Sequence, residues 1–202
     1  MVRTDSNIPK LPLTDTSDGI TTIGQKAYFE GWVGFASLHK SVNCSEALTR
    51  PKSNFLYSTA VPRLTAAEIV KSCQKSCETF RQNYGFERYP KVTKEEHHFP
   101  IAFIILFHTS LDQVLFLLRA IYRPQNVYCL TVDLNAKREL LEGISAVSSC
   151  FHNVFVASKL ERVVYAGFSR LVADLHCMED LLAHPIPWKY VINLPGQQFP
   201  LK

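Results

Sequence analysis

The sequence predicts an α/β protein in which helices flank a parallel, doubly wound sheet. From residue 64 onward, short apolar runs of strand length alternate with segments of helical periodicity. Parallel strands joined through helices follow right-handed crossovers, so this alternation indicates helices on both faces of the sheet. The chain has 202 residues, of which 47% are hydrophobic, so it can bury a core and is not disordered throughout.

Two regions are expected along the chain, an irregular arm or stem over residues 1–63 and a partial α/β domain over residues 64–202. The first region contains turn-forming prolines and glycines and shows no sustained period. The second region opens with a capping box from Thr65 to Glu68, followed by apolar residues at helical spacing. This pattern predicts a helix that runs to about Asn83.

Four strands and three further helices are expected in the rest of the domain. A second capping box, from Ser110 to Gln113, predicts the start of the helix after the first strand, and Pro124 ends that helix. Asp133 or Asn135 is expected to cap the next helix. The expected strands span residues 99–107, 127–132, 154–157 and 188–194. The apolar stripes of the expected helices are Val114, Leu115, Leu118 and Ile121; Leu140, Leu141, Ile144 and Val147; and Phe168, Leu171, Val172, Leu175, Met178 and Leu182.

Charge and hydropathy exclude two classes of protein. Lys and Arg exceed Asp and Glu by 22 to 18, and the basic residues are scattered, without the clustering among aromatics that a nucleic-acid footprint requires. The longest apolar run, Ile101 to Phe107, is far shorter than the roughly 20 residues of a membrane-spanning helix. The first ten residues lack the apolar core of a secretory signal.

The cysteines favour an oxidising compartment. Wide spacing among them indicates disulfides more than a compact metal site, and Asn43 begins a glycosylation sequon that agrees with this compartment. The alternative is a zinc site built from Cys73, Cys77, His97 and His98, in which the two histidines are adjacent where a separation of a few residues is usual. The six cysteines are Cys44, Cys73, Cys77, Cys129, Cys150 and Cys177.

Candidate ligand-binding residues follow three of the expected strands, because ligands of such sheets bind beyond the carboxyl ends of the strands. An Asp at a strand end accepts hydrogen bonds from ribose hydroxyls or a uracil N–H, and the next helix N-terminus favours phosphate. Each position also has a structural alternative: Asp133 caps a helix, His108 bonds to backbone in a turn, and Tyr165 packs in the core. The candidates are Leu106, Phe107 and His108, then Asp133, Leu134 and Asn135, and finally Tyr165.

Several familiar signatures are missing from the sequence. It has no glycine-rich phosphate loop and no serine nucleophile elbow. Asp133-Leu134-Asn135 lacks the second carboxylate of an Asp-x-Asp metal motif, and hard cations prefer anionic oxygen ligands. A nucleotide diphosphate bound here is therefore expected to be neutralised by basic side chains and not by a metal ion.

Five motifs resemble the core 2/I-branching β-1,6-N-acetylglucosaminyltransferases. The sequon at residues 43–45 also resembles the glycosylated stem cysteine of that family, so that the resemblance covers about residues 43–202. The motifs read LRAIYRPQNVYC at 118–129, SCFHNVFVAS at 149–158, VVYA at 163–166, ADLHCM at 173–178 and WKYVINL at 188–194.

The resemblance implies a Golgi glycosyltransferase with a GT-A-like, Rossmann-like fold that needs no metal or other cofactor. Such an enzyme moves N-acetylglucosamine from UDP-GlcNAc to the 6-hydroxyl of galactose or N-acetylgalactosamine in the glycan of a glycoprotein or glycolipid. By matching motif, the donor-binding residues would be 106–108, 133–135 and Tyr165. The family pattern also implies disulfides Cys77–Cys150 and Cys129–Cys177, each worth about 3 to 4 kcal/mol. Cys44 would pair with a cysteine near the family's C-terminus, and Cys73 has no assigned partner.

The sequence departs from the family pattern at residues 193–200, where Pro195 replaces a cysteine and Gln198 an aspartate. The family's catalytic glutamate, and the Arg and Lys that stabilise the departing diphosphate, lie downstream of this segment. We therefore expect no catalytic residue within the 202 residues, an incomplete sheet with exposed apolar surface, and no activity of these residues alone.

Two alternatives remain at this point. One is a non-catalytic module that binds a UDP-sugar or associates with a full-length relative through the exposed sheet edge. The other is a cytosolic chain with reduced thiols that does not fold stably.

Overall fold

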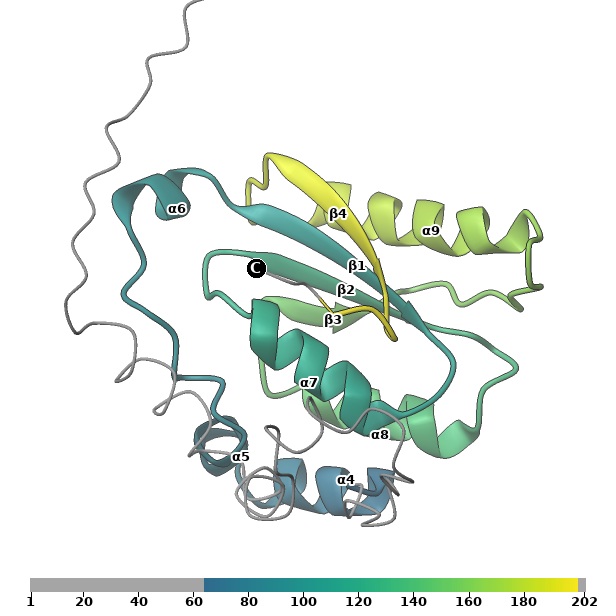
Figure 1. Cartoon of the computed structure of the whole chain (residues 1–202), viewed down its shortest axis with the longest axis horizontal. Coiled ribbons are helices and arrows are strands. Elements are labelled where there is room, and N and C mark those ends of the chain that lie inside the picture. Colours follow the sequence, from purple (N-terminus) through teal and green to yellow (C-terminus); the bar gives the residue numbers. More distant parts are fainter. Residues whose placement is uncertain (1–63, 200–202) are drawn as a thin grey trace, which may run out of the picture.

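A computed structural model describes residues 64–199, which form a parallel sheet between two layers of helices (Figure 1). The arm expected over residues 1–63, the sequon at Asn43 and Cys44 lie outside the described residues. The strands are β1 (Ile101–Phe107), β2 (Val127–Val132), β3 (Val154–Val156) and β4 (Tyr190–Pro195). The helices are α4 (Ala66–Lys75), α5 (Cys77–Asn83), α6 (Lys94–His98), α7 (Leu111–Ile121), α8 (Arg138–Ser148) and α9 (Ser169–Ala183).

The sheet has the strand order β3-β2-β1-β4, and every neighbouring pair is parallel. The chain therefore builds outward from β1 through β2 to β3 and then returns to the other side of β1 with β4. This reversal places a topological switch point between β1 and β4, where open α/β sheets bind ligands. The α/β class and the parallel, GT-A-like arrangement predicted from the sequence are confirmed.

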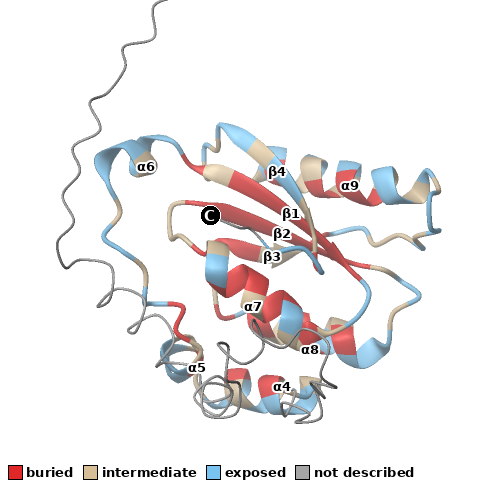
Figure 2. Ribbon diagram, in the orientation of Figure 1, coloured by how far each residue is buried: buried red, intermediate tan, exposed pale blue. Residues whose placement is uncertain are grey.

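Two apolar cores sandwich the central strands, which is why β1 and β2 read as continuous hydrophobic runs. Alternate residues of β1, such as Phe103 and Ile105, pack with α7 and α8 in the larger core. Ala102 and Ile104 point to the opposite face and pack with Cys177 and Leu181 of α9. Figure 2 shows β1 and β2 almost entirely buried, while β4 at the edge is largely exposed.

The helix predicted over 65–83 is two helices. The capping box between Thr65 and Glu68 is present, as expected. The helix is interrupted at Ser76, whose backbone is extended at φ −170°. The Ser76 side chain accepts from the N–H of Thr79 and so caps α5. The apolar spacing continues through Ser76, so periodicity alone missed a serine that ends one helix and starts the next.

The other predicted caps are wrong. Ser110 precedes α7 in a left-handed conformation, with φ 55°, and makes no side-chain capping hydrogen bond. Neither Asp133 nor Asn135 caps α8, because that helix begins only at Arg138. The short helix α6 was not expected, although Thr93 and Glu96 form a capping box that the sequence displays.

Most of the apolar stripe expected on α9 faces outward, although Met178 packs against the smaller core. Phe168 and Leu182, at its two ends, are 72% and 76% exposed, and Leu171 and Leu175 are also exposed. The helix packs instead through a neighbouring face that contains Ala173, Cys177 and Leu181. The bridge from Cys177 to Cys129 of β2 links this face to the sheet.

Both disulfides implied by the family resemblance are present. Cys77–Cys150 joins α5 to the end of α8, and Cys129–Cys177 joins β2 to α9. The zinc alternative is wrong because Cys77 is bridged. Cys73 is a free thiol, and burial raises its pKa to about 11. Within residues 64–199, no helix is long and apolar enough to cross a membrane.

Candidate functional site

Asp133 links two loops at the carboxyl ends of the strands. Its Oδ1 accepts from the N–H of Asn135 at 2.8 Å and from the N–H of Val163 at 3.2 Å. The N–H of Leu134 donates to the carbonyl of Glu161 at 3.0 Å. Asp133 therefore does not cap a helix, and its carboxylate holds the loop after β2 against the loop that leads to α9.

The second of these loops contains a tight turn that presents Tyr165. The N–H of Gly167 donates to the carbonyl of Val164 at 2.9 Å, and Ser169 Oγ accepts from the N–H of Val164 at 2.8 Å. Tyr165 is 98% exposed, so the alternative that it packs in the core is wrong. Its ring is available to stack on a planar ligand.

Backbone strain is found at the same end of the sheet. Within residues 64–199, the non-glycine residues with positive φ are Ser110, at 55°, and Ala166, at 56°. Ser110 lies in the loop after β1, and Ala166 follows Tyr165 in the loop after β3. Conformations of this kind cost of order 1–3 kcal/mol and concentrate at ligand-binding sites. Their position agrees with the expectation that ligands bind at the carboxyl ends of the strands.

At the end of β1, two of the three candidate side chains are buried, and their backbone groups hold the neighbouring segments in place. Leu106 and Phe107 are buried, and their carbonyls accept from the N–H groups of Gly196 and Asp133. Any contact of these two residues with a ligand would have to go through the backbone. His108 is exposed, and its ring makes no hydrogen bond to the rest of residues 64–199. The structure thus brings His108, Asp133 and Tyr165 to one edge.

A buried carboxyl group lies beside this edge, at the switch point between β1 and β4. Asp174 of α9 is 6% exposed and accepts a short hydrogen bond from the side-chain amide of Asn193 on β4. Burial raises the pKa of Asp174, against the opposing effects of Asn193 and the nearby Arg170. This contact couples α9 to β4, and sequence reasoning missed it because the two residues come from separate elements.

Basic groups near the edge come from the same loop and helix. Arg162 follows Glu161 in the loop paired with Leu134, and Arg170 occupies the first turn of α9; both are exposed. No group of three or more His, Cys, Asp or Glu in the described part of the chain could hold a metal ion. The edge therefore has cations suited to a diphosphate beside a carboxylate suited to ribose or uracil.

The profile of one protein family, described as Core-2/I-branching enzyme, matches residues 101–202, which include all four strands and every candidate site residue. The chain belongs to the Core-2/I-branching enzyme family. The match begins at the first residue of β1, so the family region coincides with the whole described sheet.

Curated relatives of this Core-2/I-branching protein carry names that describe a transferase. Human β-1,3-galactosyl-O-glycosyl-glycoprotein β-1,6-N-acetylglucosaminyltransferase 3 is 48% identical over 131 residues, which are 65% of this chain and 30% of that protein. The mouse protein of the same name is 41% identical over 169 residues, 80% of this chain and 38% of that protein. A bovine herpesvirus 4 enzyme is 40% identical over 171 residues, which are 81% of this chain and 38% of that protein. The chain thus spans about a third of the length of these relatives.

Proposed function

We propose that this chain forms the donor-binding part of a β-1,6-N-acetylglucosaminyltransferase and binds UDP-GlcNAc at the carboxyl ends of β1 and β2. The acceptor would be a galactose or N-acetylgalactosamine unit in the glycan of a glycoprotein or glycolipid. Family membership and the names of the relatives support the reaction class. The structural support is the arrangement of Asp133 with the loop that carries Tyr165.

The carboxylate of Asp133, positioned at the end of β2, is the observation on which the proposal rests. Both hydrogen bonds that the Asp133 carboxylate accepts within residues 64–199 use Oδ1, so Oδ2 is the oxygen available to accept from a ribose hydroxyl or a uracil N–H. Tyr165 would stack on the base or pack against the sugar. Arg162 and Arg170 would neutralise the diphosphate, so we propose that donor binding requires no metal ion.

Titration calorimetry with UDP tests the donor site directly. We expect the 202-residue chain to bind UDP, and Asp133→Ala to weaken binding by about tenfold or more through loss of a charged acceptor. Asp133→Asn is the matched control, because its amide oxygen can still accept from Val163 while the charge is gone. Equal UDP affinity in all three proteins would refute the assignment, and loss of binding in EDTA would refute metal independence.

Transfer of the sugar is a separate step that needs a base on the attacking hydroxyl, usually a 10²- to 10⁴-fold contribution. No residue of the described edge is an evident base for an acceptor, so we propose that the 202 residues alone do not transfer N-acetylglucosamine. Incubation with UDP-GlcNAc and a galactose-terminated acceptor, followed by mass spectrometry, tests this. Turnover comparable with that of a family enzyme would overturn the proposal.

The two disulfides support a location in an oxidising lumen, and we propose the Golgi on family grounds. Mass spectrometry of the chain from secretory cells should find a glycan on Asn43 and both bridges. Reduced cysteines and an unmodified Asn43 would contradict this location.

A second candidate function is a non-catalytic module that binds a partner such as a full-length relative. The outward stripe of α9 and the exposed Tyr190 and Ile192 on edge strand β4 favour it, because exposed apolar patches mark interaction surfaces. Co-expression with a family enzyme separates the candidates: a partner module forms a stable complex whether or not UDP binds.

A further inference from the structure

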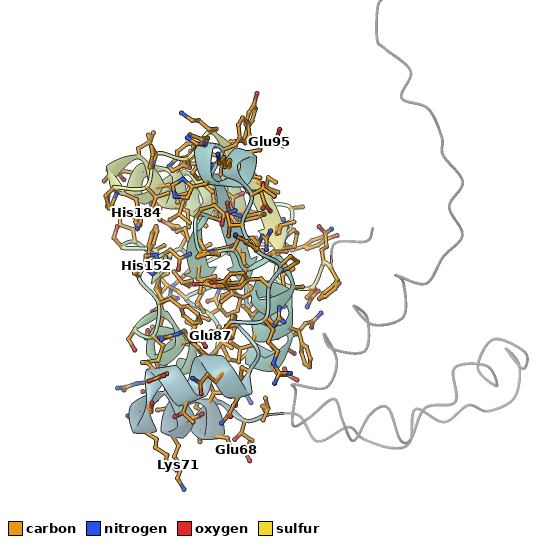
Figure 3. The ribbon with its side chains drawn as sticks, turned by 90° about the vertical axis from the view of Figure 1, so that its left-hand side faces the viewer. Glu68, Lys71, Glu87, Glu95, His152 and His184 are labelled. Atoms are coloured by element: carbon orange, nitrogen blue, oxygen red, sulfur yellow. A yellow bond between two sulfur atoms is a disulfide. The ribbon has the colours of Figure 1, made fainter. Side chains whose placement is uncertain are left out.

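A cavity lies at the opposite end of the sheet from the donor edge. It has a volume of about 560 Å³ and is bounded by α5, the segment after it, the approach to β2 and the end of α8. Figure 3 views the molecule from this side and labels Glu87 and His152, two residues that line the cavity. The volume falls within the range of pockets that hold small molecules.

The walls of this amino-end cavity are held in place by covalent and polar links. Cys77 and Cys150, which both line it, form the bridge between α5 and α8. The Arg81 guanidinium donates to the carbonyl of Cys150 at 2.8 Å, across the same two elements. A cavity fixed by such links needs little ordering when a ligand enters, which favours binding.

Aromatic rings form much of the lining. Phe86 and Tyr122 are buried, while Tyr89 and Phe151 are only partly buried. The rings of Tyr122 and Phe151 lie 5.2 Å apart between centroids and those of Phe86 and Phe151 4.9 Å apart, so the lining is a packed aromatic cluster. A ligand that contacts it must offer an apolar face.

The charges of the lining cancel. Arg81 Nε lies 3.3 Å from a carboxylate oxygen of Glu87, and both groups remain partly exposed at the cavity. The paired guanidinium leaves no excess positive charge for a phosphate, and the paired carboxylate leaves no excess negative charge for a cation. Ser149 and His152 add exposed polar groups to the rim. The lining therefore matches a neutral ligand with one apolar face and a polar edge.

We propose that the amino-end cavity binds a neutral sugar ring of a glycan. A pyranose presents C–H groups on one face, suited to the aromatic lining, and hydroxyls around its edge, suited to Arg81, Glu87 and His152. The chemistry of the lining supports a sugar as the ligand. The role of the cavity as a second glycan subsite rests on the proposed transferase function. The six residues of β2 separate the two ends by about 20 Å, so this ring is not the one that reacts.

Ligand-observed NMR on the 202-residue chain tests the subsite, with methyl β-galactoside, N-acetylglucosamine and lactose as probes. We expect saturation transfer strongest for the ring protons of one apolar face. The variant Tyr89→Ala should weaken binding about tenfold, and the surface changes Glu87→Gln and His152→Ala about fivefold each. Glu87→Gln and His152→Ala alter exposed side chains, so they keep the test valid where Tyr89→Ala does not fold.

The matched control is Asp133→Ala, which should weaken UDP binding by about tenfold or more while sugar binding persists. Persistence of sugar binding without UDP binding in the unaltered chain would sink the donor site and leave this subsite standing. Absence of saturation transfer from all three sugars would overturn the subsite, as would binding that neither Glu87→Gln nor His152→Ala changes. Inorganic phosphate that competes with the sugar would also overturn it, because the lining would then favour an anion.

Discussion

The carboxylate of Asp133 accepts a hydrogen bond from the backbone N–H of Val163, which lies 30 residues further along the chain. Together with the hydrogen bond from the Leu134 N–H to the Glu161 carbonyl, this contact joins the end of β2 to the turn that presents Tyr165. It explains how an exposed loop without regular structure keeps a defined position beside the strand ends.

Removal of the Asp133 carboxylate should loosen the loop. In Asp133→Ala, the Val163 N–H loses its acceptor, and its exchange with solvent deuterium should accelerate about 5- to 30-fold. Amide exchange followed by NMR measures this, and Asp133→Asn should exchange close to the unaltered rate. Equal exchange in Asp133→Ala and the unaltered chain would mean that other contacts hold the loop.

Tyr165 should matter for ligand binding and not for folding. Because its side chain is 98% exposed, Tyr165→Ala should change the free energy of unfolding by less than about 0.5 kcal/mol. Affinity for UDP should fall by a stacking contribution of about 1–3 kcal/mol. Urea unfolding and calorimetry on the same samples separate the effects, and Tyr165→Phe should retain binding. A large loss of stability would assign Tyr165 a structural role instead.

Gly196 should tolerate no side chain. A Cβ at this position would lie 2.6 Å from the Cβ of Phe107, and the residue is buried where its N–H bonds to Leu106. Gly196→Ala should therefore lower the free energy of unfolding by about 1–3 kcal/mol through overpacking. Gln198→Ala, an exposed change two residues away, serves as the control in urea unfolding. Equal stability of the two variants would show that β4 can shift away from β1.

Asp174 should make stability depend on pH. Its pKa is raised above the ordinary value of 3.8, chiefly by burial, so the folded state holds the proton more tightly than the unfolded state. The contribution of this group to stability is therefore greatest at low pH and declines as the pH rises through the folded pKa. Asp174→Asn should show a smaller decline and be at least as stable near neutral pH, since its amide oxygen can accept from Asn193. Thermal melts across this pH range test it, and marked destabilisation of the variant at neutral pH would contradict it.

Each disulfide should stabilise the fold by about 4 kcal/mol, given loops of 73 and 48 residues. The paired variants Cys77→Ala with Cys150→Ala, and Cys129→Ala with Cys177→Ala, remove one bridge each without leaving a free partner. Urea unfolding measures the loss. Removal of the Cys129–Cys177 bridge should lower the free energy of unfolding by more than the loop-entropy contribution alone, because both residues are fully buried in the core between the sheet and α9. A loss below about 1 kcal/mol in either case would contradict the prediction.

Most of the fold could be read from local patterns. β1 and β2 are buried on both faces, and a strand in that environment must be a continuous apolar run, so the sequence identifies it directly. These runs alternate with helical segments, and this alternation predicts parallel strands. Two neighbouring parallel strands cannot be joined by a short turn, so a helix usually crosses between them. The motif resemblance added the two cysteine pairings, which spacing alone leaves open.

Tertiary contacts decided the features that no local pattern contains. The helix α9 packs on the sheet through the face that carries Cys177, which is bridged to Cys129, and most of the predicted apolar stripe stays exposed. The role of Asp133 depends on Val163, and that of Asp174 on Asn193, each supplied by a separate element. The amino-end cavity likewise joins residues from four separate segments, 77–81, 86–89, 122–124 and 149–152. Local periodicity reports which residues avoid water, whereas the choice of partner depends on how the chain crosses the sheet and which distant groups that brings within bonding distance.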